Sequence, residues 1–444
     1  MAAEASRVPW RSRVLRDRAS WAIALFFVFL LVVFWTITRV VMLPHGHLET
    51  YSPHVINGDE PHYLLVVNSI LFDHDLELQD DYLRAIWGPD AGGVPLPDHH
   101  SILVNRQTGQ HGLWFQHHLD IGMEPGPDIY EVSSHPVAFP AMVAALIAPF
   151  HPTINEVQGD ASLVMVLTCW LGAIFTYLLS RRLGMGRWPA LLATALLAFA
   201  SPWLAYTRSF YSEPVTGLAA LIAFWALEGD RPATSALAAS AAAFFKPPFA
   251  VIGGGFLIDR IEQKRWRDFL VLFSVLSVCG IALIAFNYWL ARTAIISGNY
   301  VGPWPFGSGT APNFSHLSDT FFGSEHGLFV WVPWTLFAIF PIGQAFCSPG
   351  ARPRFIREMS FPMGLQLALL TGFSQPPGTC YGPRYWVPFL PWMSVAAVQT
   401  FRTSGWVSRT AFVILALVSL AFSVVGALRY PQMFSKSPWY LWPN

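Results

Sequence analysis

The sequence predicts an all-α, polytopic membrane protein with about 11 transmembrane helices and a large outer loop that bears juxtamembrane helices. Three observations predict this class: 53% of the 444 residues are hydrophobic, only 12% are charged, and the apolar residues fall in long runs. A helix needs about 20 apolar residues to cross a bilayer, whereas a soluble protein would carry about 25% charged residues. The formal net charge of zero gives no indication of a nucleic-acid partner.

The N-terminal segment predicts the orientation. Arginines between Arg7 and Arg18 precede an apolar run at 20–43, which is too long for a signal-peptide core and lacks a cleavage site. Most of the 27 Lys and Arg residues fall in this tail and in short loops on the same side, so we expect a cytoplasmic N-terminus. The scarcity of Lys indicates a bacterial source and hence the bacterial inner membrane. The expected spans lie at 20–43, 161–181, 188–207, 213–229, 232–245, 247–259, 268–291, 326–347, 360–374, 385–400 and 410–428.

The regions between the spans complete the expected organisation. The apolar segment 136–150 is too short to cross the membrane and is interpreted as a re-entrant or interfacial helix. The four Cys are scattered, so neither a disulfide framework nor a zinc site is predicted. In chain order we expect a cytoplasmic tail (1–19), a first span (20–43), a large outer loop with juxtamembrane helices (44–160), a transmembrane module (161–291), a second outer loop (292–325), C-terminal spans (326–428) and an outer tail (429–444).

Two acidic motifs follow predicted outer boundaries of the membrane. Asp59 precedes Glu60-Pro61 and is placed to begin a helix, where the helix dipole favours an ionised carboxylate; it could be a general base, an anchor for a sugar hydroxyl, or simply a helix cap. Glu213 precedes Pro214 at the outer end of a span, where a carboxylate must be hydrated or paired. Pairing with Arg208 or helix capping are the structural alternatives.

Two cations are equally unusual in position. Lys246 lies between two apolar runs, where a lone ammonium needs an anionic partner. Arg384 opens a span after Tyr381-Gly-Pro. A lipid phosphate would satisfy both, since Arg binds phosphate through two parallel hydrogen bonds. The alternatives are a salt bridge from Lys246 to Glu213 and an Arg384 side chain that reaches the membrane surface.

Histidines are concentrated in the large outer loop. Imidazoles beside carboxylates can bind zinc or manganese, but no HExxH motif occurs. We therefore expect no required cofactor and no metal ion, and leave a divalent metal as the less favoured alternative. His135-Pro136 stands out because it enters the predicted interfacial helix. The other members of the set are Asp98-His99-His100, His111 and His117-His118.

The order of these motifs resembles the C-type membrane glycosyltransferases, which take sugars from polyprenyl-phosphate carriers and include protein O-mannosyltransferases and lipid A aminoarabinose transferases. The resemblance rests on the order of the motifs and on the topology of residues 20–260, and it is looser over the remainder of the sequence. Glu213 stands where relatives often have Asp, and His-Pro-Val where Pro-Pro is common. The motifs are Gly58-Asp59-Glu60, Ser134-His135-Pro136, Glu213-Pro214, Phe245-Lys246-Pro247, Gly323-Ser-Glu325-His326-Gly327-Leu328 and Gly382-Pro383-Arg384-Tyr385.

The resemblance implies an enzyme that moves a sugar from a polyprenyl-phosphate donor to an envelope glycan, lipid or protein acceptor on the periplasmic face, with inversion. Its partners would be that donor, the acceptor and membrane lipid. A lipid-linked oligosaccharide transporter and a polysaccharide polymerase or ligase component remain alternatives. The expected catalytic residues are Asp59, Glu60 and Glu213, and the expected substrate-binding residues are Lys246, Arg384, Arg208, Tyr211, His135, Tyr381, Glu325 and His326.

Overall fold

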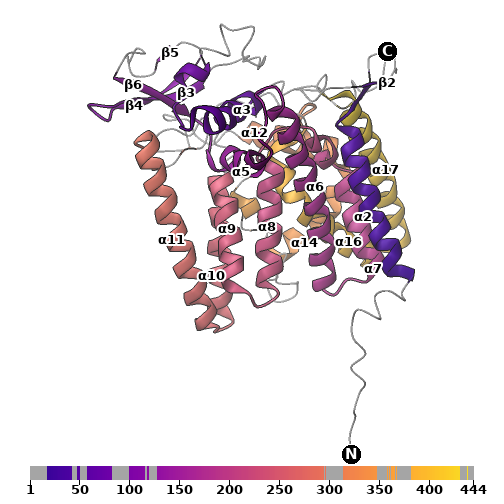
Figure 1. Ribbon diagram of the computed structural model, residues 1–444. Coiled ribbons are helices and arrows are strands. Elements are labelled where there is room, and N and C mark those ends of the chain that lie inside the picture. The colour runs from indigo at the N-terminus through magenta and orange to yellow at the C-terminus, as the bar shows by residue number, and fades with distance from the viewer. Residues whose placement is uncertain are drawn as a thin grey trace, which may run out of the picture.

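The protein is a bundle of roughly parallel helices with shorter elements lying across one end (Figure 1). We call this end, which carries α3, α5 and the strands, the upper end. The computed structural model describes residues 18–42, 48–50, 58–82, 100–115, 118–119, 128–294, 314–347 and 382–430, with short pieces at 296, 358, 360, 362–365, 367 and 438. Most of the predicted span at 360–374 therefore lies outside the described residues.

Among the described residues, four helices are long and apolar enough to cross a membrane. These four and the shorter apolar helices form the bundle. Some predicted spans are built from two shorter pieces. The span 188–207 is α7 (Arg187–Phe199) followed by the turn η3 (Pro202–Thr207), and the span 247–259 is η4 (Pro247–Ala250) followed by α10 (Val251–Glu262). The four long helices are α2 (Arg18–Ile37), α6 (Val157–Arg182), α11 (Trp266–Ala291) and α17 (Trp406–Arg429). The shorter ones are α7 (Arg187–Phe199), α8 (Glu213–Leu227), α9 (Pro232–Phe245), α10 (Val251–Glu262), α14 (Leu336–Cys347) and α16 (Leu390–Thr403).

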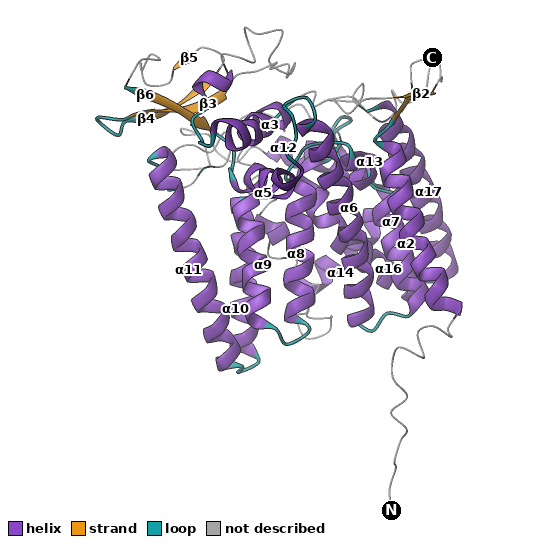
Figure 2. Ribbon diagram, viewed as in Figure 1, coloured by secondary structure: helices purple, strands orange, loops and turns teal. Residues whose placement is uncertain are grey.

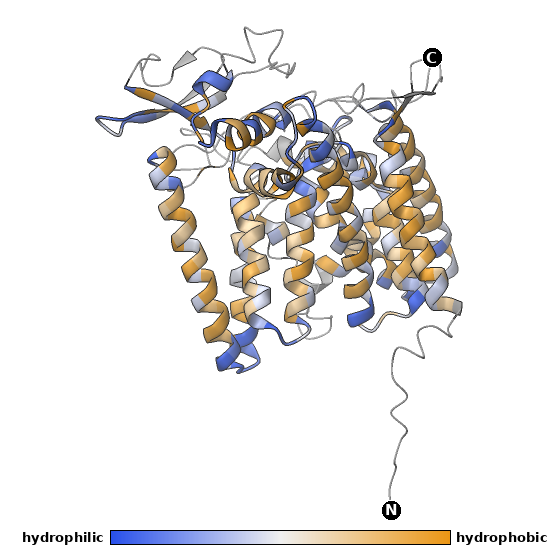
Figure 3. Ribbon diagram, in the orientation of Figure 1, coloured by the Kyte–Doolittle hydropathy of each residue, from blue (hydrophilic) through white to orange (hydrophobic). Residues whose placement is uncertain are grey.

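The distribution of hydropathy along these helices is that of a membrane protein. Figure 3 shows apolar residues along the middle of the bundle and hydrophilic residues at both ends. In α11, nine large hydrophobic side chains, among them Phe273, Ile281 and Trp289, are exposed on the outside of the bundle. Such a surface is stable in lipid but not in water. The helical membrane class predicted from composition is therefore correct, whereas the number of spans stays a prediction.

Short helices lie across the upper end and connect the bundle to the site. α3 (Glu60–Asn68) is buried along its whole length and continues as the π-helical turn η1 (Ser69–Asp73). α5 (Ala138–Ile147) and the turn η2 (Ala148–Phe150) form the segment predicted as an interfacial helix. The two helices pack through Tyr63 and Phe139, whose rings meet edge to face with centroids 5.1 Å apart. The other short elements are η3 (Pro202–Thr207), η4 (Pro247–Ala250), α12 (Phe314–Phe322), α13 (Leu328–Trp331), η5 (Pro333–Thr335) and η6 (Arg384–Phe389).

The large loop also contains strands, which the all-α prediction did not include (Figure 2). An antiparallel sheet has the order β5-β4-β3-β6, and β3 pairs with both β4 and β6. Its hairpin turns at Gly109, whose φ of +70° favours glycine, and the run Ile102, Leu103 and Val104 is buried. A short apolar run beside a turn is typical of a buried strand. The strands are β1 (Val40–Met42), β2 (Leu48–Thr50), β3 (His100–Asn105), β4 (His111–Phe115), β5 (His118–Leu119) and β6 (Ile129–Ser133).

Candidate active site

Asp59 occupies the N-cap position of α3, but its side chain makes no capping hydrogen bond to the helix. The carboxylate instead contacts the Arg384 guanidinium and lies 3.7 Å from Nδ1 of His135. About a fifth of the Asp59 side chain remains exposed. Simple helix capping therefore does not account for this residue, and its carboxylate is still accessible to a small group.

Glu213 accepts hydrogen bonds from both predicted phosphate-binding cations. Its Oε1 lies 2.6 Å from Nζ of Lys246 and 2.7 Å from Nε of Arg384, and the side chain is completely buried. Lys246 reaches this position because it ends α9 in an extended conformation, as a residue before proline prefers. The salt bridge between Lys246 and Glu213, one of the sequence-based alternatives, is thus present.

Close packing between α8 and η6 brings Arg384 to this carboxylate. One helical turn after Glu213, a Cβ added at Gly217 would lie 3.2 Å from backbone atoms of Pro388. Glycine here allows η6 to approach α8 more closely than a side chain would permit. The Arg384 guanidinium also stacks over Tyr211, 4.1 Å from the ring centroid, so two of the predicted substrate-binding residues are in contact.

Four charged groups from four distant segments thus form one cluster at the upper end of the bundle, which we call the charged cluster: Asp59, Glu213, Lys246 and Arg384. The two carboxylates balance the two cations. Burying a charge in this way is tolerated only when a partner of opposite sign is within contact distance. Tyr385, for which no role was expected, also lies here, with its ring centroid 4.9 Å from Nζ of Lys246. Its position directly after Arg384 was the available signal.

His135 lies beside this cluster in a buried environment. Burial lowers the pKa of its imidazole, while the Asp59 carboxylate acts in the opposite direction. The ring packs against Tyr63 and His62, with centroids 5.3 and 5.6 Å away, and the backbone N–H donates to Ser133 Oγ. The imidazole can therefore orient a neighbouring hydroxyl or carboxylate in its neutral form. Tyr63 is a second residue that sequence reasoning left without a role.

Glu60, which was expected to be catalytic, has a different environment. Its side chain is 1% exposed, and Oε1 accepts hydrogen bonds from the Phe210 N–H at 2.6 Å and from the Tyr430 hydroxyl at 2.9 Å. These contacts join the start of α3 to the segment before α8 and to the end of α17. Glu60 therefore holds three segments together that are far apart in the sequence.

Arg208 also binds backbone groups. Its Nη1 donates to the carbonyl oxygens of Val40 and Ala427, at 2.9 and 2.7 Å, and its guanidinium lies over the Tyr430 ring. Glu213, which Arg208 was considered to neutralise, is held by Lys246 and Arg384. Arg208 therefore links β1, η3 and α17 near the cluster.

Glu325 and His326 lie close to the turn that presents Arg384. His326 Nδ1 is 3.2 Å from the carbonyl oxygen of Gly382, which has a φ of +58°. The indole of Trp331 donates to the backbone carbonyl of Glu325, and its ring is in contact distance of Gly382. These residues support the Gly382 turn. Tyr381 lies outside the described residues.

Metal-binding potential was considered for the histidine set and for the acidic residues. Asp98, His99 and His117 lie outside the described residues, as do the side chains of His100 and His118. Within the described part of the chain, ligand atoms of Asp73, Asp80 and Asp81 all lie within 4.8 Å of one another. Exposed acidic groups often gather in this way without an ion, so the expectation that no metal is required stays a prediction.

Comparisons with known proteins identify the fold. No protein-family model and no curated protein matches the sequence. The structure is similar to that of ArnT from Cupriavidus metallidurans in the apo state, with a TM-score of 0.53 and 13% identity, over 94% of this chain and 67% of that one. For the same ArnT bound to undecaprenyl phosphate, the TM-score is 0.48 and the sequence identity is 14%, with the same coverage of both chains. A third similar structure is the archaeal oligosaccharyltransferase AglB from Archaeoglobus fulgidus, in complex with an inhibitory peptide and a dolichol-phosphate. Its TM-score is 0.44 and its sequence identity 11%, over 95% of this chain and 56% of AglB.

ArnT is a lipid A aminoarabinose transferase and AglB an oligosaccharyltransferase, and both are membrane proteins of the GT-C fold. The similarity to apo ArnT extends over nearly the whole chain and includes the helical bundle and the elements across its upper end. This protein is therefore a membrane protein with the GT-C fold.

Proposed function

We propose that this protein transfers a sugar from a polyprenyl-phosphate donor to a hydroxyl group of an envelope glycan, lipid or protein acceptor, with inversion at the anomeric carbon. The observation that carries the proposal is the charged cluster, in which Asp59 and Glu213 meet Lys246 and Arg384. A carboxylate base and cations for a phosphate are the two requirements of this reaction. The GT-C fold shared with ArnT supports the same class by analogy.

Asp59 is the proposed general base. The acceptor oxygen attacks the anomeric carbon, its proton passes to Asp59, and the bond from the anomeric carbon to the phosphate oxygen breaks. The polyprenyl phosphate leaves with the bonding electrons. The partial exposure of Asp59 allows the acceptor to approach, whereas Glu213 is completely buried. Glu213 therefore positions the two cations, and the base role that it was considered to share belongs to Asp59.

Lys246 and Arg384 are proposed to bind the donor phosphate. An ammonium has three N–H donors and a guanidinium five, and the contacts found among the described residues use only some of these. The remaining donors can stabilise the charge that develops on the leaving phosphate, a contribution of about 3 kcal/mol for one well-placed donor.

Donor binding is also proposed to activate the base. Arg384 holds Asp59 and Glu213 at the same time, and an ion pair makes a carboxylate a weaker base. A phosphate that takes over part of the guanidinium would loosen its bond to Asp59 and increase the basicity of that carboxylate. Proton transfer would then occur only when the donor is in place.

The proposed location is the bacterial inner membrane, with the N-terminus in the cytoplasm and the charged cluster on the periplasmic side. The distribution of cations supports this orientation. Arg181, Arg182, Arg265 and Arg267 lie at helix ends in the hydrophilic lower region of Figure 3. Cytoplasmic loops are enriched in such residues.

Binding of the carrier itself tests the proposal without knowledge of the sugar. The full chain in nanodiscs should bind undecaprenyl phosphate and should not bind undecaprenol, because the phosphate supplies the contact to Lys246 and Arg384. Lys246→Met should weaken this binding at least tenfold, whereas Lys264→Met, at an exposed position at the lower end, should not. Equal binding of the phosphate and the alcohol would contradict the proposal.

A further inference from the structure

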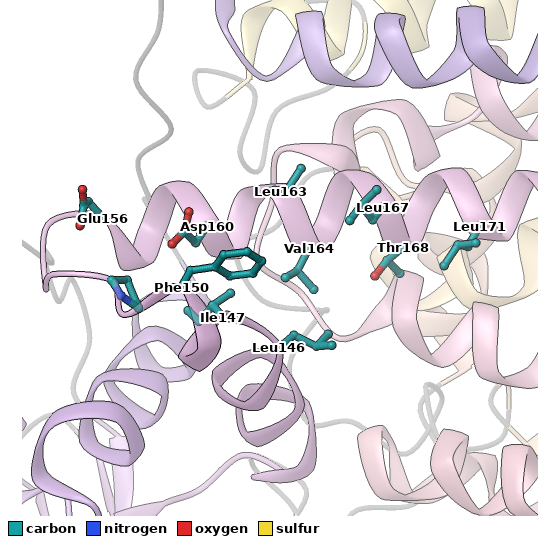
Figure 4. Close-up of a pocket in the computed structure, with 11 residues that line it drawn as sticks. Leu146, Ile147, Phe150, Glu156, Asp160, Leu163, Val164, Leu167, Thr168 and Leu171 are labelled. Carbon is teal, nitrogen blue, oxygen red and sulfur yellow. The ribbon is translucent and has the colours of Figure 1, made fainter.

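A groove of about 630 Å³ lies between α6 and the α5–η2 segment at the upper end. Figure 4 shows side chains from both segments facing this space, with two carboxylates at one end and, along the rest, apolar side chains together with Thr168. The groove is lined by Leu146, Ile147, Phe150, Pro152, Glu156, Asp160, Leu163, Val164, Leu167, Thr168 and Leu171. Its walls beyond the mouth are therefore apolar except for Thr168.

The apolar part has the shape needed for a single hydrocarbon chain. Leu163, Leu167 and Leu171 recur at intervals of four residues on one face of α6, and each is a little over one third exposed. From Asp160 to Leu171 the helix rises by about 16 Å. Phe150 closes the opposite side and is also strongly exposed. Because α6 is long and apolar enough to span the membrane, an acyl chain can enter this strip from the surrounding lipid.

The mouth of the groove carries negative charge. Glu156 accepts two hydrogen bonds, from the Thr153 N–H and from the Thr153 hydroxyl, both at 2.8 Å. These bonds lower the pKa of Glu156 and keep it ionised. Asp160 lies one turn further along the same helix and lines the same space. Among the residues that the structure describes, no Lys or Arg forms an ion pair with either carboxylate.

We propose that this groove binds one acyl chain of a phospholipid whose head group carries a primary amine, with the ammonium placed between Glu156 and Asp160. An ammonium donates three hydrogen bonds, which two acceptor carboxylates can use. Anionic head groups are repelled by the same charges. The groove is separate from the charged cluster, because Phe139 and Val143 on the buried side of α5 pack toward Tyr63 and Leu146 and Phe150 face outward.

The test uses the full chain and three phospholipids with identical acyl chains, carrying ethanolamine, choline or glycerol head groups. Native mass spectrometry of protein released from mixed micelles should show retention of the ethanolamine lipid over each of the others by about two- to fivefold, the ratio expected for a partly exposed ion pair. Equal retention of the three lipids would overturn the proposal.

Variants of the protein separate the contribution of the lipid head group to binding from that of the acyl chain. Glu156→Gln together with Asp160→Asn should remove the preference, whereas Asp319→Asn, at an exposed position on α12, should preserve it. Leu167→Trp should fill the groove and abolish retention, and Leu178→Trp, further along α6 and outside the groove, should not. A preference for the ethanolamine lipid that survives the double substitution would exclude the amine-bearing lipid as the occupant. A dimer of this chain without bound lipid in the mass spectrum would exclude it as well.

Discussion

Two groups of carboxylates at the upper end of the bundle have opposite surroundings. In the charged cluster, Glu213 is completely buried and is in contact with both Lys246 and Arg384. At the mouth of the groove beside α6, Glu156 is exposed and its hydrogen bonds come from Thr153. A carboxylate that is removed from water needs a cation, whereas an exposed one is stabilised by solvent.

This difference has consequences for ligands. A phosphate can compete for the cations of the charged cluster, because those cations are already oriented by carboxylates. The groove offers acceptors without cations, so it favours an ammonium group. The same residue type at the same end of the molecule is thus proposed to recognise ligands of opposite charge, and the following predictions test the cluster side of this comparison.

The largest expected effect is on sugar transfer by Asp59→Asn. Loss of a general base costs about 10²–10⁴-fold in rate, and asparagine can still accept a hydrogen bond from Arg384, so folding should be retained. Release of polyprenyl phosphate from a labelled donor measures the rate. Asp128→Asn, which changes an exposed acid in the large loop, serves as the control. A folded Asp59→Asn variant with full activity would remove Asp59 from the mechanism.

Next in size is the loss of stability on Arg384→Gln. The substitution leaves Glu213 buried with Lys246 as its remaining cation. Breaking a buried ion pair costs about 3–5 kcal/mol, and the lower value applies because Lys246 stays in place. The midpoint of thermal unfolding, followed by tryptophan fluorescence, should fall. Adding Glu213→Gln should restore part of the loss, and Arg267→Gln at the exposed lower end should have little effect.

Glu60 provides a smaller but more discriminating test. Glu60→Gln keeps an acceptor for the Phe210 N–H and the Tyr430 hydroxyl, so activity should remain close to that of the wild type. Glu60→Ala leaves both donors buried, at a cost of about 1–3 kcal/mol, and should lower the unfolding midpoint. A loss of activity in Glu60→Gln as severe as that in Asp59→Asn would favour the catalytic role that the sequence suggested.

The smallest expected effect concerns pH. Because burial holds the pKa of His135 below its ordinary value in the folded state, the unfolded chain takes up the proton first as pH falls. The stability contributed by the neutral imidazole is complete above about pH 6.5 and is lost below it. The unfolding midpoint should therefore decrease between pH 7 and 5, less steeply in His135→Gln than in His111→Gln. Parallel curves for the two variants would contradict this assignment.

The helical membrane class and the candidate residues were accessible from sequence because each depends on local chemistry. Long apolar runs predict helices in lipid, and a carboxylate before proline or a lysine between two apolar runs is unusual enough to be noticed. The strands at 100–105 and 111–115 were within reach of the same reasoning, since the hairpin carries two short apolar runs, Ile102 to Val104 and Leu113 to Phe115, separated by a glycine turn. They were missed because the loop was interpreted from its charge and its histidines.

Other features depend on contacts between segments that are far apart in the chain. Asp59 and Glu60 are neighbours with similar chemistry, yet one contacts Arg384 and the other braces Phe210 and Tyr430. Their side chains leave the start of α3 in different directions, and the elements that meet each one are set by how the bundle packs. Local sequence therefore indicates which residues need a partner, while tertiary packing decides which partner each of them obtains, because a buried charge is neutralised by whichever group of opposite sign the fold brings within contact distance.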